Sequence, residues 1–282
     1  MKTRILVGVA LAAAFALTLQ AAQAQDYPVH LPDQVIRQSF SLGTAPFVKV
    51  DNVNGSIRIA GDGGTTVRLT ATEKIKAKTR DLAREALREV TLKLSHTGDS
   101  LDASVDGPFR GRHWDNPGYQ VRFIFVLHVP ARASIAMRSV NGSVKVEDVQ
   151  GGFEARTVNG SVAVSGAVGA GEARTVNGRI TAAFSAEPTG NSSFHTVNGA
   201  VDVTLPRTVN ARLRYKTFNG KVYSDFDVTP VAGSADVSAR TEGGMRVFRR
   251  GRWTDGQIGH GGPQLSFDTL NGNIYIRGGS QR

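Results

Sequence analysis

The stretch ARTVNGSVAV, residues 155–164, returns almost unchanged as ARTVNGRITA at residues 173–182. An apolar residue followed by Asn-Gly occurs seven times in the chain, with the asparagines at Asn54, Asn141, Asn159, Asn177, Asn198, Asn219 and Asn271. Four consecutive spacings are 18, 18, 21 and 21 residues. Periods near 20 residues are typical of architectures that stack one small unit on the next, so this repeat decides the expected fold.

Each repeat has the pattern of two strands joined at a corner. Asn-Gly suits a tight turn because both residues tolerate positive φ angles. Ala155 and Thr157 precede Asn159, and Val162 and Val164 follow it, each set at alternate positions. Alternation with period two indicates a half-buried strand. Each repeat is therefore predicted to fold as strand, Asn-Gly corner and strand.

Two arrangements of these strands fit the pattern. Asn-Gly between alternating strands is also a strong hairpin signal, which would produce an antiparallel meander. Parallel stacking at about 4.8 Å instead places Thr over Thr and Asn over Asn, so that side chains can bond their copies in the next unit. The identity of these positions has a physical use only in the stack. We therefore predict an all-β fold, a right-handed or similar β-solenoid of short strands with one short helix.

The start of the chain and its composition indicate an exported protein. Lys2 and Arg4 precede an uncharged run of 15 residues, and Ala22-Gln23-Ala24 has the pattern that signal peptidase cleaves. The net charge is +10, and the absence of cysteine excludes disulfides. We predict a signal peptide over residues 1–24, no membrane-spanning segment after its cleavage, and a periplasmic or cell-surface location.

The rest of the chain is predicted to contain two continuous parts. Residues 25–130 form an N-terminal β section, in which residues 79–90 have the apolar spacing of one amphipathic helix capped by Thr79. Residues 91–105 have the pattern of a hairpin. Residues 131–282 form the β-strand repeat section.

The repeat section contains a long interruption. The Gly-rich residues 229–262 separate the repeat around Asn219 from a last repeat at residues 264–277. Loops of this length are either functional or poorly ordered. We expect an excursion from the stack that returns for one more unit.

The signal sequence, the strand-helix-hairpin section and the repeated Thr-Val-Asn-Gly-x-Val/Ile-x-Val units resemble the bacterial "putative adhesin" family of β-strand repeats. The resemblance covers roughly residues 45–278. It implies a β-solenoid at the cell envelope or surface, with no agreed catalytic residues to carry over.

Motifs of common enzyme classes are absent from the sequence. It has no His-Glu-x-x-His, no Gly-x-Ser-x-Gly and no phosphate-binding loop, and its six histidines lack ligand spacing. Paired carboxylates of a polysaccharide-cleaving β-helix enzyme remain a catalytic option, with Asp225 and Asp227 on one strand face or Glu154 and Glu172 in successive units. Each glutamate is followed two residues later by a neutralising arginine. We therefore predict a protein that is not an enzyme and has no cofactor and no metal.

Two similar loops hold both tryptophans of the chain: FRGRHW at residues 109–114 and FRRGRW at residues 248–253. Tryptophan with arginine suits sugar rings and phosphates, because the indole stacks while the guanidinium binds acceptor oxygens. The alternative is a tryptophan that covers the edge of the stack. The candidate ligand-binding residues are Arg110, Arg112, Trp114, Arg249, Arg250, Arg252 and Trp253.

A second candidate is a column of cations three residues before successive corner asparagines. Stacking would place Arg138, Arg156 and Arg174 on one face, followed by His195 and Lys216. Such a column attracts an extended anionic polymer. Two exposed charges about 5 Å apart repel by only about 0.8 kcal/mol in water, so a solvated face explains the column without a ligand.

The sequence favours a non-catalytic envelope protein, an adhesin-type binding or structural solenoid that contacts an anionic envelope polymer or a surface protein rather than nucleic acid. The alternative is a periplasmic accessory or sensor protein that binds a protein partner. An outward-pointing row of Val140, Val158, Val176, Val197 and Phe218 would support that alternative. We expect these side chains to point inward at the corner.

Overall fold

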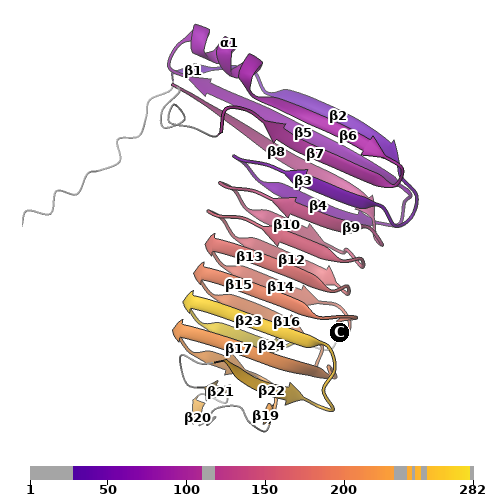
Figure 1. Cartoon of the computed structure of the whole chain (residues 1–282), viewed down its shortest axis with the longest axis vertical. Helices are drawn as coiled ribbons and strands as arrows, with labels where there is room; N and C mark the ends of the chain where they lie inside the picture. Colours follow the sequence, from indigo (N-terminus) through magenta and orange to yellow (C-terminus); the bar gives the residue numbers. More distant parts are fainter. Residues whose placement is uncertain (1–27, 110–117, 232–239, 243–244, 249–252, 280–282) are drawn as a thin grey trace, which may run out of the picture.

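The computed structural model describes residues 28–109, 118–231, 240–242, 245–248 and 253–279. These residues form two large sheets, sheet A and sheet B, and one α-helix (Figure 1). The fold is therefore all-β with one helix, as predicted. No helix in the described part of the chain is long and apolar enough to cross a membrane. The predicted signal peptide lies outside the described residues.

Each repeat unit contributes one strand to each sheet, so the two strands of a unit are not paired with each other. The strands before the corners belong to sheet B: β3 (Phe47–Asp51), β9 (Ser134–Arg138), β11 (Phe153–Arg156), β13 (Gly171–Asn177), β15 (Ser192–Asn198), β17 (Ala211–Asn219) and β23 (Gln264–Asn271). The strands after the corners belong to sheet A: β4 (Ile57–Asp62), β10 (Val144–Glu147), β12 (Val162–Ala167), β14 (Ile180–Phe184), β16 (Val201–Leu205), β18 (Val222–Ser224) and β24 (Ile274–Gly278).

Equivalent strands of neighbouring units pair in parallel and in register. In sheet B, Ala155 lies opposite Ala173. In sheet A, Val144 lies opposite Val162. An antiparallel meander of the repeats, the alternative that the Asn-Gly signal left open, is therefore wrong, because the chain changes sheets at each corner instead of turning back on itself.

The order of strands along the sheets differs from their order in the sequence at both ends. The β23–β24 unit lies between the β15–β16 unit and the β17–β18 unit, and Figure 1 shows it in yellow at that place. The β3–β4 unit similarly lies between the β9–β10 unit and strands β7 (Ser100–Asp106) and β8 (Tyr119–Pro130). The last repeat is therefore present where the sequence placed it in the chain, but it is not the last unit of the stack.

Antiparallel strands cover the N-terminal end of the stack. Strand β5 (Thr66–Ala77) pairs with β8 and in turn with β1 (Val29–His30) and β2 (Gln34–Ser41). The hairpin predicted at residues 91–105 is formed by β6 (Thr91–Thr97) and β7. Helix α1 (Arg80–Glu89) packs against β5 and β8, and the predicted cap is present, since Thr79 Oγ1 accepts a hydrogen bond from Leu82 N at 3.2 Å.

Antiparallel strands also cover the other end, and they come from the predicted excursion. In sheet B, β22 (Thr254–Ile258) pairs with β17, and β19 (Thr229–Pro230) pairs with β22. In sheet A, β21 (Met245–Phe248) pairs with β18, and β20 (Arg240–Glu242) pairs with β21. These strands occupy the edge of the last stacked unit, which would otherwise be free to pair with another chain.

The core lies between the two sheets and runs through the units as one apolar cluster. Alternate residues of each strand face inward, such as Val162 and Val164 in β12. Between units, Phe194 and Phe267 stack with their ring centroids 5.5 Å apart. Each unit therefore buries its apolar side chains against its neighbours as well as against the opposite sheet.

The corners select glycine mainly for space. Among the seven corner glycines, only Gly55 has a positive φ, +118°. A Cβ added at Gly160 would lie 2.2 Å from the carbonyl oxygen of Gly142, and one added at Gly178 would lie 2.0 Å from that of Gly160. Our expectation that positive φ explains Asn-Gly is wrong for the other six corners, where stacking leaves no room for a side chain.

Candidate functional site

The asparagines of the seven corners form one hydrogen-bonded ladder on the surface. In six of the seven asparagines, Nδ2 donates to the Oδ1 of the asparagine in the adjacent unit, at 2.8 or 2.9 Å; Asn54 ends the ladder as an acceptor. From donor to acceptor, the order is Asn219, Asn271, Asn198, Asn177, Asn159, Asn141 and Asn54. The prediction that asparagines bond their copies in the next unit is confirmed. Asn271 lies between Asn198 and Asn219 in the ladder, although it follows both in the sequence.

The threonines two residues before the asparagines behave differently. Thr157 Oγ1 donates to the carbonyl oxygen of Gly142 at 2.8 Å, and Thr175 Oγ1 donates to that of Gly160 at 2.8 Å. Both threonines are buried. The expectation that threonines bond one another is therefore wrong, because each hydroxyl satisfies a corner carbonyl of the adjacent unit.

The residue directly before each corner asparagine points outward; it follows a buried threonine in five units, Ser139 in one and Asn52 in one. We call these residues the apolar row; in stack order they are Val53, Val140, Val158, Val176, Val197, Leu270 and Phe218. Val140 is 40% exposed and Phe218 is 58% exposed, while Val53 and Val197 are partly exposed. The expected inward orientation is wrong. Since the preceding residue is buried, strand alternation turns the next one toward solvent.

The arginine column exists, but it is neutralised. Arg138, Arg156 and Arg174 lie opposite one another in register on sheet B. Glu154 Oε1 lies 2.9 Å from Arg138 Nη2 and 3.2 Å from Arg156 Nε, and Glu172 pairs with Arg156 and Arg174. The hydrogen bond to Glu154 raises the pKa of Arg138. The column is thus a network in which two carboxylates bridge three guanidinium groups.

Further along the stack, the cationic column is interrupted by an acid. Strand β23 lies between β15 and β17, so its Asp268 is opposite both His195 of β15 and Lys216 of β17. Its Oδ2 is 3.1 Å from His195 Nδ1. The predicted succession of five cations therefore does not form.

Of the two carboxylate pairs considered for catalysis, one is brought together as predicted, because Glu154 and Glu172 lie opposite each other in register on β11 and β13. Glu154 and Glu172 are held by the arginine network. Asp225 and Asp227 follow the end of β18 and do not share a strand face, and Asp225 Oδ2 accepts a hydrogen bond from Gly278 N at 3.1 Å.

Of the candidate loop residues, the structure describes Trp253. Arg110, Arg112, Trp114, Arg249, Arg250 and Arg252 lie outside the described residues. Trp253 is 37% exposed and precedes β22. Arg214 Cζ and Lys216 Nζ of β17 lie 4.9 and 5.8 Å from its ring centroid. The cations beside Trp253 are therefore Arg214 and Lys216 of β17, which the sequence analysis did not place near it.

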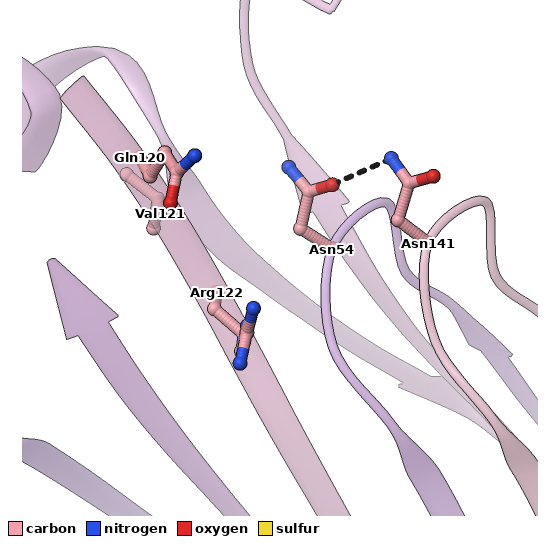
Figure 2. Close-up of a pocket in the computed structure, with 5 residues that line it drawn as sticks. All are labelled: Asn54, Gln120, Val121, Arg122 and Asn141. Atoms are coloured by element: carbon pink, nitrogen blue, oxygen red, sulfur yellow. Dashed lines mark hydrogen bonds between the residues drawn. The ribbon is translucent and has the colours of Figure 1, made fainter. Parts of the chain in front are cut away.

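A cleft of about 280 Å³ lies where the first Asn-Gly corner meets β8 (Figure 2), and it is lined by Asn54, Gln120, Val121, Arg122 and Asn141. In Figure 2 the side chains of Gln120 and Arg122 lie along β8 on the side of the asparagine corner. Sequence reasoning missed this cleft because β8 is distant from Asn54 in the sequence. The only signal was the pair of polar residues at alternate positions at the start of a strand that continues with the apolar run 123–127.

No protein family matches the sequence, and no curated protein matches it. Among solved structures, the chain is similar to a "putative cell adhesion protein" of Clostridium sporogenes, with 11% identity and a TM-score of 0.41 over 88% of this chain and 100% of that chain. It is also similar to a "putative adhesin" of Bacteroides fragilis, with 10% identity and a TM-score of 0.34 over 86% of this chain and 97% of that chain. A "putative lipid binding protein" of Parabacteroides distasonis has 9% identity and a TM-score of 0.26 over 86% of this chain and 96% of that chain. At these values the likenesses carry no argument about function, which has to be inferred from the geometry of the chain.

Proposed function

We propose that the chain is an exported, non-catalytic binding module of the cell envelope, a β-solenoid of the "putative adhesin" type that docks on another protein through its apolar row. The exposure of that row carries the proposal. Its seven members follow one line along the stack, and at the spacing of paired strands they cover roughly 30 Å.

The packing of the stack does not require apolar residues in this row. Each member stands between a buried threonine, serine or asparagine and an asparagine of the surface ladder, and its side chain is exposed or partly exposed rather than part of the core. Contiguous exposed apolar surface on a soluble protein marks an interaction site. A row that is one residue wide suits an extended apolar segment of a partner protein.

The charge distribution supports a protein partner over an anionic polymer on the same side of the stack. Glu154 and Glu172 occupy the guanidinium groups of the arginine column, so a polymer would have to displace them. Burial of the apolar row gains free energy that depends little on salt, whereas contacts with exposed cations weaken as salt rises.

One observation favours a second candidate, an anionic glycan bound at the end of sheet B. Trp253 offers a partly exposed ring, and Arg214 and Lys216 lie against it. An indole stacks on a sugar ring, and neighbouring cations pair with its acidic groups.

The test is co-sedimentation of purified protein lacking residues 1–24 with a cell-envelope fraction, across a salt series and with or without protease digestion of that fraction. A row variant carries Val158→Thr, Val176→Thr, Leu270→Thr and Phe218→Thr. Threonine is polar and favours strands, so the stack should be retained. Val35→Thr, at an exposed valine of β2 outside the row, is the matched control.

We expect binding that persists in high salt, disappears when the fraction is digested, and is lost in the row variant but not in the control. Binding that survives digestion, falls with salt and is unchanged in the row variant would overturn docking through the apolar row. A further Trp253→Ala variant would then locate the polymer at the end of sheet B.

A further inference from the structure

The asparagine ladder has a direction, and one of its ends opens into the cleft beside β8. Every ladder bond runs from an Nδ2 donor to an Oδ1 acceptor in the same sense, so Asn54 accepts from Asn141 and its own amide NH₂ donates to no other asparagine of the ladder. Figure 2 shows that NH₂ group turned toward Gln120. At the opposite end, Asn219 leaves its Oδ1 as the terminal acceptor.

Aligned amides polarise one another and add their dipoles. A chain of amides that all donate toward Asn54 has its positive end at the terminal NH₂ of Asn54, as the free N–H groups mark the positive end of a helix. The ladder therefore places partial positive charge at the mouth of the cleft, although asparagine itself carries no net charge.

Arg122 adds a full charge at the same place. Within the described part of the chain, its guanidinium has no acidic partner and the side-chain amide of Gln120 has no hydrogen-bond partner, in contrast to the neutralised arginine column. The stem of Arg122 lies close over the corner, because a Cβ added at Gly55 would be 2.9 Å from Arg122 Cγ. The glycine thus gives the arginine room to lie beside the end of the ladder.

We propose that this cleft binds an anionic group, a carboxylate or a phosphate, held by the Arg122 guanidinium and by the side-chain amides of Asn54 and Gln120. Arginine offers a planar fork of donors that matches both groups, and the two amides supply neutral donors from the other sides. The volume of about 280 Å³ suits a small headgroup rather than a polymer. The proposal does not rest on docking through the apolar row.

The test is a titration of ¹⁵N-labelled protein with methyl phosphate and, separately, with acetate, at constant ionic strength maintained with chloride. We expect saturable shifts in the side-chain amide resonances of Asn54 and Gln120 for at least one probe. The probe that binds more tightly identifies phosphate or carboxylate as the group recognised. Non-saturable shifts with both probes would overturn the proposal.

Two variants and one control locate the site. Arg122→Gln should weaken binding about tenfold or more, because it removes a charged donor pair. Asn159→Ala interrupts the ladder away from the cleft and should weaken binding about two- to fivefold, the size of a helix-dipole effect. Arg132→Gln removes another exposed arginine without a described partner and should change nothing. Equal affinity in Arg122→Gln and Arg132→Gln would contradict the proposed site, and unchanged affinity in Asn159→Ala would contradict the role of the ladder.

Discussion

Asn271 donates a hydrogen bond to Asn198 at 2.8 Å, across 73 residues of sequence. It also accepts one from Asn219, at 2.8 Å. The unit nearest the C-terminus is thus inserted between two units that follow each other directly in the chain. The β17–β18 unit has no parallel partner in either sheet until β23 and β24 are in place, so the stack can close only after most of the chain has been synthesised.

Deleting residues 264–282 should disrupt the stack far more than the loss of a terminal repeat would. It removes the parallel partners of β17 and β18 and exposes the edges of β15 and β16, and free edges promote association. We expect loss of a single cooperative melting transition by circular dichroism, together with aggregation in size-exclusion chromatography. Deletion of residues 280–282 alone should leave both unchanged. A monomeric 1–263 chain that melts like the full protein would show that the inserted unit is dispensable.

Interior and terminal asparagines of the ladder should differ in their effect on stability. In the ladder, the Asn177 side chain donates to Asn159 and accepts from Asn198, whereas the Asn219 side chain donates to Asn271 and accepts from no other ladder asparagine. At about 0.5–1 kcal/mol for each exposed bond, Asn177→Ala should lower the free energy of unfolding by about 1–2 kcal/mol and Asn219→Ala by about half as much. Urea denaturation of the two variants measures the difference, and equal losses would mean that the ladder bonds contribute little.

Alanine at an interior corner should be among the most damaging single substitutions. At Gly160 the new Cβ would lie 2.2 Å from the carbonyl oxygen of Gly142. The backbone of one unit fixes the Cβ and the backbone of the next unit holds the oxygen, so neither atom can move alone. We expect Gly160→Ala to cost about 3 kcal/mol or more. Gly63→Ala, where nothing lies within 4 Å of the new Cβ, should be neutral in the same thermal denaturation. Comparable melting temperatures for the two variants would contradict the steric explanation.

The repeat predicted the pairing of strands because equivalent residues lie side by side: Thr175 opposite Thr196, and Asn177 opposite Asn198. The order of units could not be predicted in the same way. Asn219 and Asn271 lie in the same local pattern, a threonine and an apolar residue before the asparagine and a glycine after it. Either unit therefore fits either place in the stack. Their order is decided by connections and edge strands that the repeat does not encode.

The candidate sites were less predictable from sequence because they depend on side-chain direction and on distant elements. Val140 points outward because the preceding residue, Ser139, is buried. The alternation of apolar residues on the two sides of an Asn-Gly corner does not tell which of these two residues faces the core. The arginine column is neutralised in part because Glu154 pairs with Arg138 of the adjacent unit as well as with Arg156 of its own. The cleft combines Asn54 with Arg122, which no local pattern connects.

Glu73 is a carboxylate on the inward face of β5. Its side chain is 6% exposed, and its neighbours on the same face include Ala71 and Ile75. Burial raises its pKa above the ordinary value of 4.5. Between 4.5 and the raised pKa, the folded protein retains a proton that the unfolded chain has released, so the free energy of unfolding falls as pH rises through that window. Below pH 4.5 this loss is absent.

Glu73→Gln should therefore stabilise the protein at pH 8 relative to wild type and have little effect at pH 4, because the amide resembles the protonated acid and carries no charge into the interior. Urea denaturation of both proteins at pH 4, 6 and 8 measures the expected divergence. Glu85→Gln, at a partly exposed position of helix α1, makes the same chemical change at a less buried site and should not reproduce it. A Glu73→Gln variant that is destabilised equally at pH 4 and pH 8 would show that the carboxyl group makes a favourable contact in the fold, and that its burial is not what penalises the charged form.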